Sequence, residues 1–307
     1  MNATTTRGAL LAALACVLVG GSFTANSLLG DYPYAGGQFL RYALAFLLRV
    51  PFAGPGARDR LRSLGAGRWL RLALLAAVGM VGFNLAVLAA ERTAEPAVFG
   101  VFVGCAPVVV AVLVPLLDGR RPQRVVLYGA LFVAVGAFTV QGWGRTDGAG
   151  IAFSVCALIG EVGFAVLAVP VLRPRLLSTV VCGVAAAESA LAGVLIDGSG
   201  WLRRPDAVEA GALLWQAVVV TVVGFVCWYM GMQRIGAERA TLFSGLIPVA
   251  AACTAPLVGT GSYGAAQAVG SALVCAGVAV GSGASPRFRG KVPTRRQRVS
   301  ERSLEKL

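Results

Sequence analysis

One acidic residue stands in the middle of a long apolar stretch. Glu161 lies within residues 149–170, flanked by Gly160 and Gly163. An ionisable group at bilayer depth is costly unless it faces a partner or water, so Glu161 is a candidate functional residue. A carboxyl group facing a cavity would bind a cationic group or a coupling proton. The alternative is a carboxyl group neutralised by a structural hydrogen bond.

Two more ionisable residues, Arg41 and Glu188, lie in the apolar stretches 34–53 and 178–197. They could form a charge pair, or either could contact a ligand. A structural role is favoured for both. A long arginine side chain can also extend from within the membrane towards its surface.

Polar and aromatic side chains add to the candidate binding residues. Asn84 lies in the stretch 69–90, and Trp228 and Tyr229 lie in the stretch 210–232. An amide can hydrogen-bond a polar ligand, and aromatic rings suit apolar or cationic groups. Helix packing or anchoring at the membrane interface is an equally good interpretation of the aromatic pair.

Three polar residues, Ser22, Thr24 and Asn26, follow one another at a spacing of two in the stretch 8–28. Side chains two positions apart do not share one face of a helix. The spacing therefore predicts that at most two of the three contact a ligand.

The residue types argue against catalysis and metal binding. The chain has no histidine, and its seven cysteines all lie in apolar stretches without a CxxC spacing. Zinc sites and disulfide frameworks use such residues at characteristic spacings. HExxH, GxSxG and an aspartate pair within the membrane are also missing from the sequence. We therefore predict no metal, no cofactor and no enzymatic activity.

The composition indicates an integral membrane protein. Hydrophobic residues make up 57% of the 307 residues and charged residues only 13%, with a mean hydropathy of +0.76. Soluble domains carry roughly 25% charged residues. The net charge of +13 is spread over short loops and a tail, so it does not predict a nucleic-acid partner.

Ten apolar stretches of about the length needed to cross a bilayer follow one another, separated by short polar breaks. The first is interpreted as a retained span and not as a cleaved signal peptide. The predicted helices cover residues 8–28, 34–53, 69–90, 96–117, 124–142, 149–170, 178–197, 210–232, 239–259 and 264–283.

Basic residues give these helices an orientation, because cytoplasmic loops are rich in Lys and Arg. With the N-terminus inside, the opposite side receives only Arg92, Arg145, Arg203 and Arg204. Both termini are therefore predicted to be cytoplasmic. The residues placed inside are Arg58, Arg60, Arg62, Arg68, Arg120, Arg121, Arg124, Arg173, Arg175, Arg234, Arg239 and the basic tail.

A duplication organises the ten stretches. The segment beginning Pro107-Val108 recurs 141 residues later as Pro248-Val249, and the same offset relates Gly129 to Gly270. Five helices, an odd number, make one repeat, so the second repeat must enter the membrane from the opposite face. Inverted repeats of this kind are typical of secondary transporters.

The duplication defines the predicted organisation of the chain. Residues 1–142 and 143–285 form the two five-helix repeats, and residues 286–307 form a basic, disordered cytoplasmic tail. Prolines inside helices remove a backbone hydrogen bond and can kink them. The symmetry-related Pro107 and Pro248 are therefore predicted gating elements, and a static bend is the alternative.

The sequence around the second proline resembles the EamA-like family of the drug/metabolite transporter superfamily. Residues 232–240, MQRIGAERA, lead into Leu246-Ile247-Pro248 and are similar to a junction between the eighth and ninth helices of that family. Residues 41–46, RYALAF, are similar to its second-helix motif. The glutamate that commonly follows the proline helix is replaced by Asp118-Gly119-Arg120 in the first repeat. Because of this departure, the substrate of any one relative cannot safely be assigned to this chain.

The resemblance implies ten helices and export of small metabolites, such as amino acids or xenobiotics, across a bacterial inner membrane. It also implies a central cavity built mainly from helices one, three, four, six, eight and nine. That arrangement favours structural roles for Arg41 and Glu188. Proton coupling through Glu161 stays open, and so does uncoupled exchange. A non-transporting membrane scaffold or receptor is the main alternative, and a membrane-embedded enzyme is a weaker one.

Overall fold

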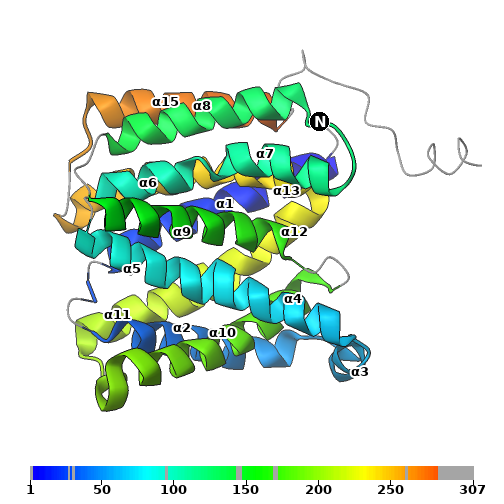
Figure 1. Ribbon diagram of the computed structural model, residues 1–307, viewed down its shortest axis with the longest axis vertical. Coiled ribbons are helices and arrows are strands. Elements are labelled where there is room, and N and C mark those ends of the chain that lie inside the picture. Colours follow the sequence, from blue (N-terminus) through cyan, green and yellow to red (C-terminus); the bar gives the residue numbers. More distant parts are fainter. Residues whose placement is uncertain are drawn as a thin grey trace, which may run out of the picture.

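The protein is all-helical in the part of the chain that its structure describes. The computed structural model describes residues 3–26, 28–29, 32–93, 96–142, 147–168, 172–259 and 262–282. Every regular element in these ranges is a helix, and none is a strand. The long helices run side by side in one general direction (Figure 1). The predicted tail, 286–307, lies outside the described residues.

The predicted apolar stretches are helical over most of their described residues. In and between the first five stretches the elements are α1 (Ala3–Asn26), α2 (Tyr34–Arg49), η1 (Val50–Phe52), α3 (Ala57–Arg62), α4 (Ala66–Ala76), η2 (Ala77–Gly82), α5 (Phe83–Thr93), α6 (Pro96–Gly104), α7 (Ala106–Leu117) and α8 (Arg124–Gln141). In and between the last five stretches the elements are α9 (Gly148–Val166), α10 (Pro174–Asp197), η3 (Gly198–Gly200), α11 (Ala207–Leu214), η4 (Trp215–Gly224), α12 (Phe225–Ile235), α13 (Ala237–Ala240), η5 (Thr241–Gly245), α14 (Leu246–Thr254), η6 (Ala255–Val258) and α15 (Ala265–Gly281).

Several of these helices are suited to a bilayer. Within the described residues, seven helical segments are long and apolar enough to cross a membrane. This property makes the chain a multi-pass membrane protein, and the prediction of ten crossing helices stays a prediction. The seven segments are Thr4–Ser22, Ala66–Val87, Arg124–Gln141, Gly148–Val166, Pro174–Gly200, Ala207–Ile235 and Ala237–Leu257.

Two of the long helices contain a π-helical segment. The segment η2 joins α4 to α5, and η4 joins α11 to α12. Shifted by the 141 residues of the duplication, η2 falls within η4. Short π-helical insertions are rare and occur frequently at functional sites.

The first helix of each half packs against helices of the other half. Helix α1 contacts η4, α12 and α14, whereas α9 contacts η2, α5 and α6. Two further contacts join the halves directly, α2 with α10 and α8 with α15. Figure 1 shows α8 and α15 together at one end of the helix stack and α2 and α10 together at the other.

Glycines let α8 and α15 approach closely. A Cβ atom added at Gly136 would lie 2.8 Å from the carbonyl oxygen of Gly270, and one added at Gly129 would lie 2.7 Å from that of Gly277. Small residues permit such close backbone contact between membrane helices. The order of the two contacts also shows that α8 and α15 run antiparallel.

The two prolines of the duplication lie at helix starts. Pro107 is in the first turn of α7, which follows a break at Cys105, and Pro248 is in the first turn of α14, which follows η5. The first N–H groups of a helix have no intrahelical acceptor, so proline removes no hydrogen bond there. Each proline thus lies at a change in helical hydrogen bonding, and its role as a gating element stays a prediction.

Candidate functional site

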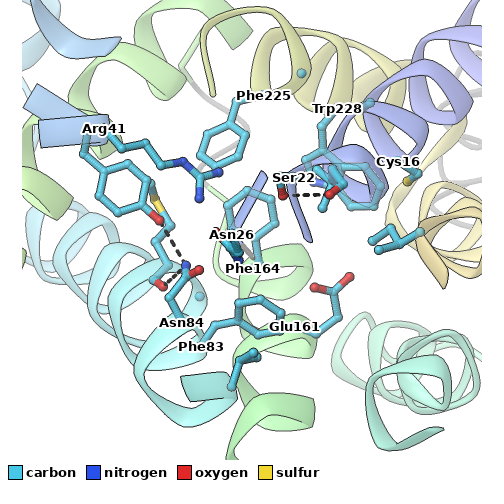
Figure 2. Close-up of a pocket in the computed structure, with 18 residues that line it drawn as sticks. Cys16, Ser22, Asn26, Arg41, Phe83, Asn84, Glu161, Phe164, Phe225 and Trp228 are labelled. Atoms are coloured by element: carbon cyan, nitrogen blue, oxygen red, sulfur yellow. Dashed lines mark hydrogen bonds between the residues drawn. The ribbon is translucent and has the colours of Figure 1, made fainter. Parts of the chain in front are cut away.

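A cavity lies between the two halves of the helix stack. Its walls come from α1, α2, η2, α5, α9, α12 and α14, together with Gly224 at the end of η4. Figure 2 shows the side chains that point into it. Both π-helical segments therefore contribute to the wall, η2 through Gly79 and Met80 and η4 through Gly224.

Glu161 of α9 lies in the cavity wall, as the functional interpretation of the sequence requires. Its carboxylate points towards the open space in Figure 2. In the described part of the chain, no hydrogen bond or ion pair satisfies this carboxylate. An acid in such a position is available to a ligand or to a proton.

Arg41 of α2 also lies in the wall, and it is 6% exposed. Its Nε donates to Oγ1 of Thr221 at 2.8 Å, and its Nη1 donates to Oε1 of Gln38 at 3.4 Å. The family resemblance favoured a structural role for Arg41, but the middle of α2 places Arg41 and Tyr42 in the cavity wall. Among the described residues, no ion pair joins Arg41 to Glu188.

Asn84 of α5 lines the cavity, but its side-chain amide already makes hydrogen bonds to other residues of the protein. Its Nδ2 donates to the hydroxyl of Tyr42 at 3.1 Å and to the carbonyl of Met80 at 2.7 Å. Its Oδ1 accepts from the hydroxyl of Tyr34 at 3.3 Å. Both amide hydrogens therefore have acceptors, so Asn84 positions Tyr42 in the cavity wall.

Aromatic rings form much of the remaining wall. The Phe164 ring lies 5.3 Å from that of Phe225 and 6.3 Å from that of Trp228, measured between centroids. Trp228 was predicted from the sequence, whereas Phe164 and Phe225 were missed. Their spacing carried a signal, because Phe164 follows Glu161 by three residues and Phe225 precedes Trp228 by three, which places each pair on one helix face.

Two polar residues of the first helix reach the cavity. Ser22 and Asn26 both line it, at the spacing of four that shares one helix face. Ser22 donates to the carbonyl of Val19 at 2.7 Å, and the Asn26 amide oxygen accepts from Gln216 at 2.6 Å. The side chain of Thr24 lies outside the described residues.

The other predicted site residues lie away from the cavity wall. Tyr229 is fully buried with its ring 5.6 Å from that of Phe164, and Glu188 is half-buried on α10. Pro107 and Pro248 are likewise absent from the wall, although Ile247 beside Pro248 belongs to it. None of these four residues therefore belongs to the cavity wall.

One ion pair and one hydrogen bond join the halves away from the cavity. Arg120, between α7 and α8, pairs with Asp118 at 3.0 Å and with Glu238 of α13. The hydrogen bond to the Glu238 carboxylate raises the pKa of Arg120. At another site Arg203 pairs with Glu209, and the hydroxyl of Tyr32 donates to the carbonyl of Arg203 at 2.6 Å.

A stack of apolar helices around a cavity with polar and aromatic walls fits a membrane transporter. Comparison with known sequences identifies the transporter family. The sequence model of the EamA-like transporter family matches residues 6–141 and matches again at residues 149–282. The chain therefore belongs to the EamA-like transporter family.

Individual relatives have modest identity. The chain is 27% identical over 217 residues to the aromatic amino acid exporter YddG of Ancylobacter novellus, covering 66% of this chain and 72% of that one. It is 25% identical over 228 residues to the uncharacterized transporter YyaM of Bacillus subtilis (strain 168), covering 68% and 72%. A solved crystal structure superposes with a TM-score of 0.73 at 20% identity, over 89% of this chain and 96% of the other. That last similarity shows the fold.

Proposed function

We propose that this transporter is a secondary carrier that exports small metabolites by alternating access. Residues 1–142 and 143–285 are its two inverted five-helix repeats, and its ten helices cross a bacterial inner membrane with both termini in the cytoplasm. In such carriers the two repeats move against each other around a site near the midplane.

The helix contacts support the inverted repeat. Exchange of the halves converts the packing of α1 on α12 and α14 into the packing of α9 on α5 and α7. The same exchange converts the contact of Gly136 with Gly270 into that of Gly277 with Gly129. Reciprocal contacts of this kind are expected from a pseudo-two-fold axis between antiparallel halves.

The observation that carries the proposal is the cavity itself. Its wall contains Glu161 from the second half together with Arg41 and Asn84 from the first half. A site shared by both halves changes its accessibility whenever the halves rock against each other. The helix breaks before Pro107 and Pro248 lie in equivalent segments, so they are the proposed points of flexing.

Amino acids with aromatic side chains are the first substrates to test. Phe83, Phe164, Phe225 and Trp228 line the cavity, and aromatic rings favour contact with one another. The relative YddG is named as an aromatic amino acid exporter. Xenobiotics with an aromatic body are the second class in the test.

The experiment measures flux with the purified protein in proteoliposomes. Radiolabelled amino acids and aromatic drugs are loaded inside or outside, and uptake and counterflow are compared with empty liposomes. We expect saturable flux of at least one aromatic compound and faster exchange when that compound is present on both sides. A protein that binds none of the compounds and moves none across a broad metabolite panel would be a membrane scaffold or receptor instead.

A further inference from the structure

We propose that Arg41 is the anion-binding residue of the cavity and that the transported molecule carries a carboxylate. The proposal rests on the proposed function and specifies the substrate class of the same site. Substrates are then aromatic or apolar acids, including amino acids, and amines without an acid group are poor substrates.

The charge of Arg41 has no counter-ion in the described part of the chain. Its two hydrogen-bond partners, Thr221 and Gln38, are both neutral. A buried charge is strongly destabilising unless it is paired and hydrogen-bonded. A ligand carboxylate in the cavity would supply the missing negative charge.

The geometry leaves donors of Arg41 available. A guanidinium has five N–H donors, and its planar fork matches the two oxygens of a carboxylate. Nε is used by Thr221, and the Nη1 contact with Gln38 is long at 3.4 Å. Figure 2 shows the guanidinium directed into the cavity, beside the ring of Phe225.

Thr221 holds the guanidinium in this orientation. Its hydroxyl donates to the carbonyl of Gln216 at 2.8 Å and accepts from Arg41. The bond to Gln216 therefore holds the hydroxyl oxygen where it can accept from Arg41. Thr221 is fully buried within the π-helical segment η4 and is absent from the cavity wall. It is therefore a positioning residue, and Arg41 is the residue that touches substrate.

The neighbouring rings determine the rest of the substrate. Phe225 and Phe164 provide apolar surface next to Arg41, where a ring or alkyl group would lie once the acid is bound. Glu161 lies in another part of the same wall. An ionised Glu161 would disfavour binding of the acid group there, so the substrate carboxylate binds preferentially at the end of the cavity that holds Arg41.

The test compares compounds that differ only in the acid group. Phenylalanine, phenylalaninamide and phenethylamine are measured as competitors and as substrates in proteoliposomes. The wild type should prefer phenylalanine. Arg41→Gln should weaken the apparent affinity for phenylalanine by about 10- to 100-fold, the range for a lost hydrogen bond to a charged group, and leave that for the two amines within about twofold.

Two further variants separate charge from folding. Arg41→Lys keeps the positive charge but lacks the planar fork, so it should recover part of the preference. Arg234→Gln removes an exposed arginine of α12 outside the cavity wall and should retain the wild-type preference. Equal weakening for all three compounds in Arg41→Gln would overturn the proposal while leaving transport intact.

A binding measurement covers the case in which the wild type moves none of these compounds. Thermal unfolding of the detergent-purified protein is then followed with phenylalanine and benzoate at millimolar concentration. A rise in melting temperature that Arg41→Gln abolishes supports the anion site even though the proposed transport fails. No rise with either carboxylate overturns the anion site as well.

Discussion

Arg49 donates a hydrogen bond to the backbone carbonyl of Thr221, at 3.3 Å, from the end of α2. The same Nη1 contacts the carbonyl of Val222 at 3.2 Å, and Nη2 contacts that of Arg175 at 3.4 Å. Buried carbonyls need a donor, and a helix changing from π to α spacing leaves a carbonyl without one from its own backbone. Arg49 thus stabilises the end of the π-helical segment that also orients Arg41.

Arg49→Met should destabilise the protein. The side chain is 3% exposed, so its loss leaves buried carbonyl groups without a donor and costs about 1–3 kcal/mol. Thermal or denaturant unfolding in detergent measures the effect. Arg68→Met, at an exposed position of α4, is the control and should unfold like the wild type. Identical stability of Arg49 and Arg68 variants would contradict a supporting role for Arg49.

Gly136→Ala should weaken the contact of α8 with α15. The new methyl group would lie 2.7 Å from the backbone nitrogen of Val274, and backbone atoms cannot move aside as a flexible side chain can. Overpacking of this kind costs about 1–3 kcal/mol. Gly211→Ala is the matched control, because no atom lies within 4 Å of a methyl group at that position. We expect a lower melting temperature for Gly136→Ala alone.

The sequence predicted the features that depend on local composition. Apolar stretches bounded by charged or Gly-containing breaks marked the helices, and the cost of a charge in lipid singled out Glu161. The duplicated glycines Gly129, Gly136, Gly270 and Gly277 also proved to be contact residues. These features need only a count of apolar residues or a comparison of the sequence with itself.

The cavity wall was harder to predict because most helices here are apolar around their whole circumference. In a uniformly apolar helix the sequence has no periodic pattern that distinguishes lipid-facing positions from cavity-facing ones. Phe225 was therefore not assigned to the wall, whereas Arg41 was given a structural role because of the family resemblance. The π-helical segments η2 and η4 were missed for a similar reason, since runs such as AVGMVG suit α and π spacing equally.

Transport should be less impaired when the charges of Arg120 and Glu238 are exchanged than when the charge of one residue alone is reversed. Arg120→Glu places a third carboxylate beside those of Asp118 and Glu238, between α7 and α13, and should slow transport. Glu238→Arg in the same protein restores opposite charges and should recover most of the rate. A double mutant no faster than Arg120→Glu alone would show that the ion pair does not join the halves during transport.

Alkaline pH should not break this ion pair. The Glu238 carboxylate raises the pKa of Arg120, so the stabilisation is present below the ordinary pKa of an arginine and is lost only as pH rises through the still higher folded value. That value is outside the range of a transport assay. Transport measured between about pH 7 and 9 in Arg120→Lys, whose charge titrates near pH 10.4, provides the comparison. No alkaline loss is expected in either protein over this range, because a lysine beside a carboxylate also keeps its charge there.

Glu161→Gln should abolish the pH dependence of transport if Glu161 carries the coupling proton. Glutamine keeps the size and hydrogen-bonding capacity of a protonated carboxyl group but cannot release a proton. Exchange of substrate for substrate should therefore continue, whereas transport driven by an imposed pH gradient should be lost. Glu188→Gln, at the half-buried glutamate outside the cavity wall, should retain gradient-driven transport.

The two glutamate variants together discriminate between a coupling acid and a structural one. A structural role predicts that Glu161→Gln lowers the melting temperature and slows exchange and gradient-driven transport to the same extent. A coupling role predicts a normal melting temperature, because the Glu161 carboxylate has no hydrogen-bond or ion-pair partner in the described residues that glutamine would lose. Gradient-driven transport that is unchanged in Glu161→Gln would exclude coupling through this residue, and the carrier would then be a facilitator or an exchanger.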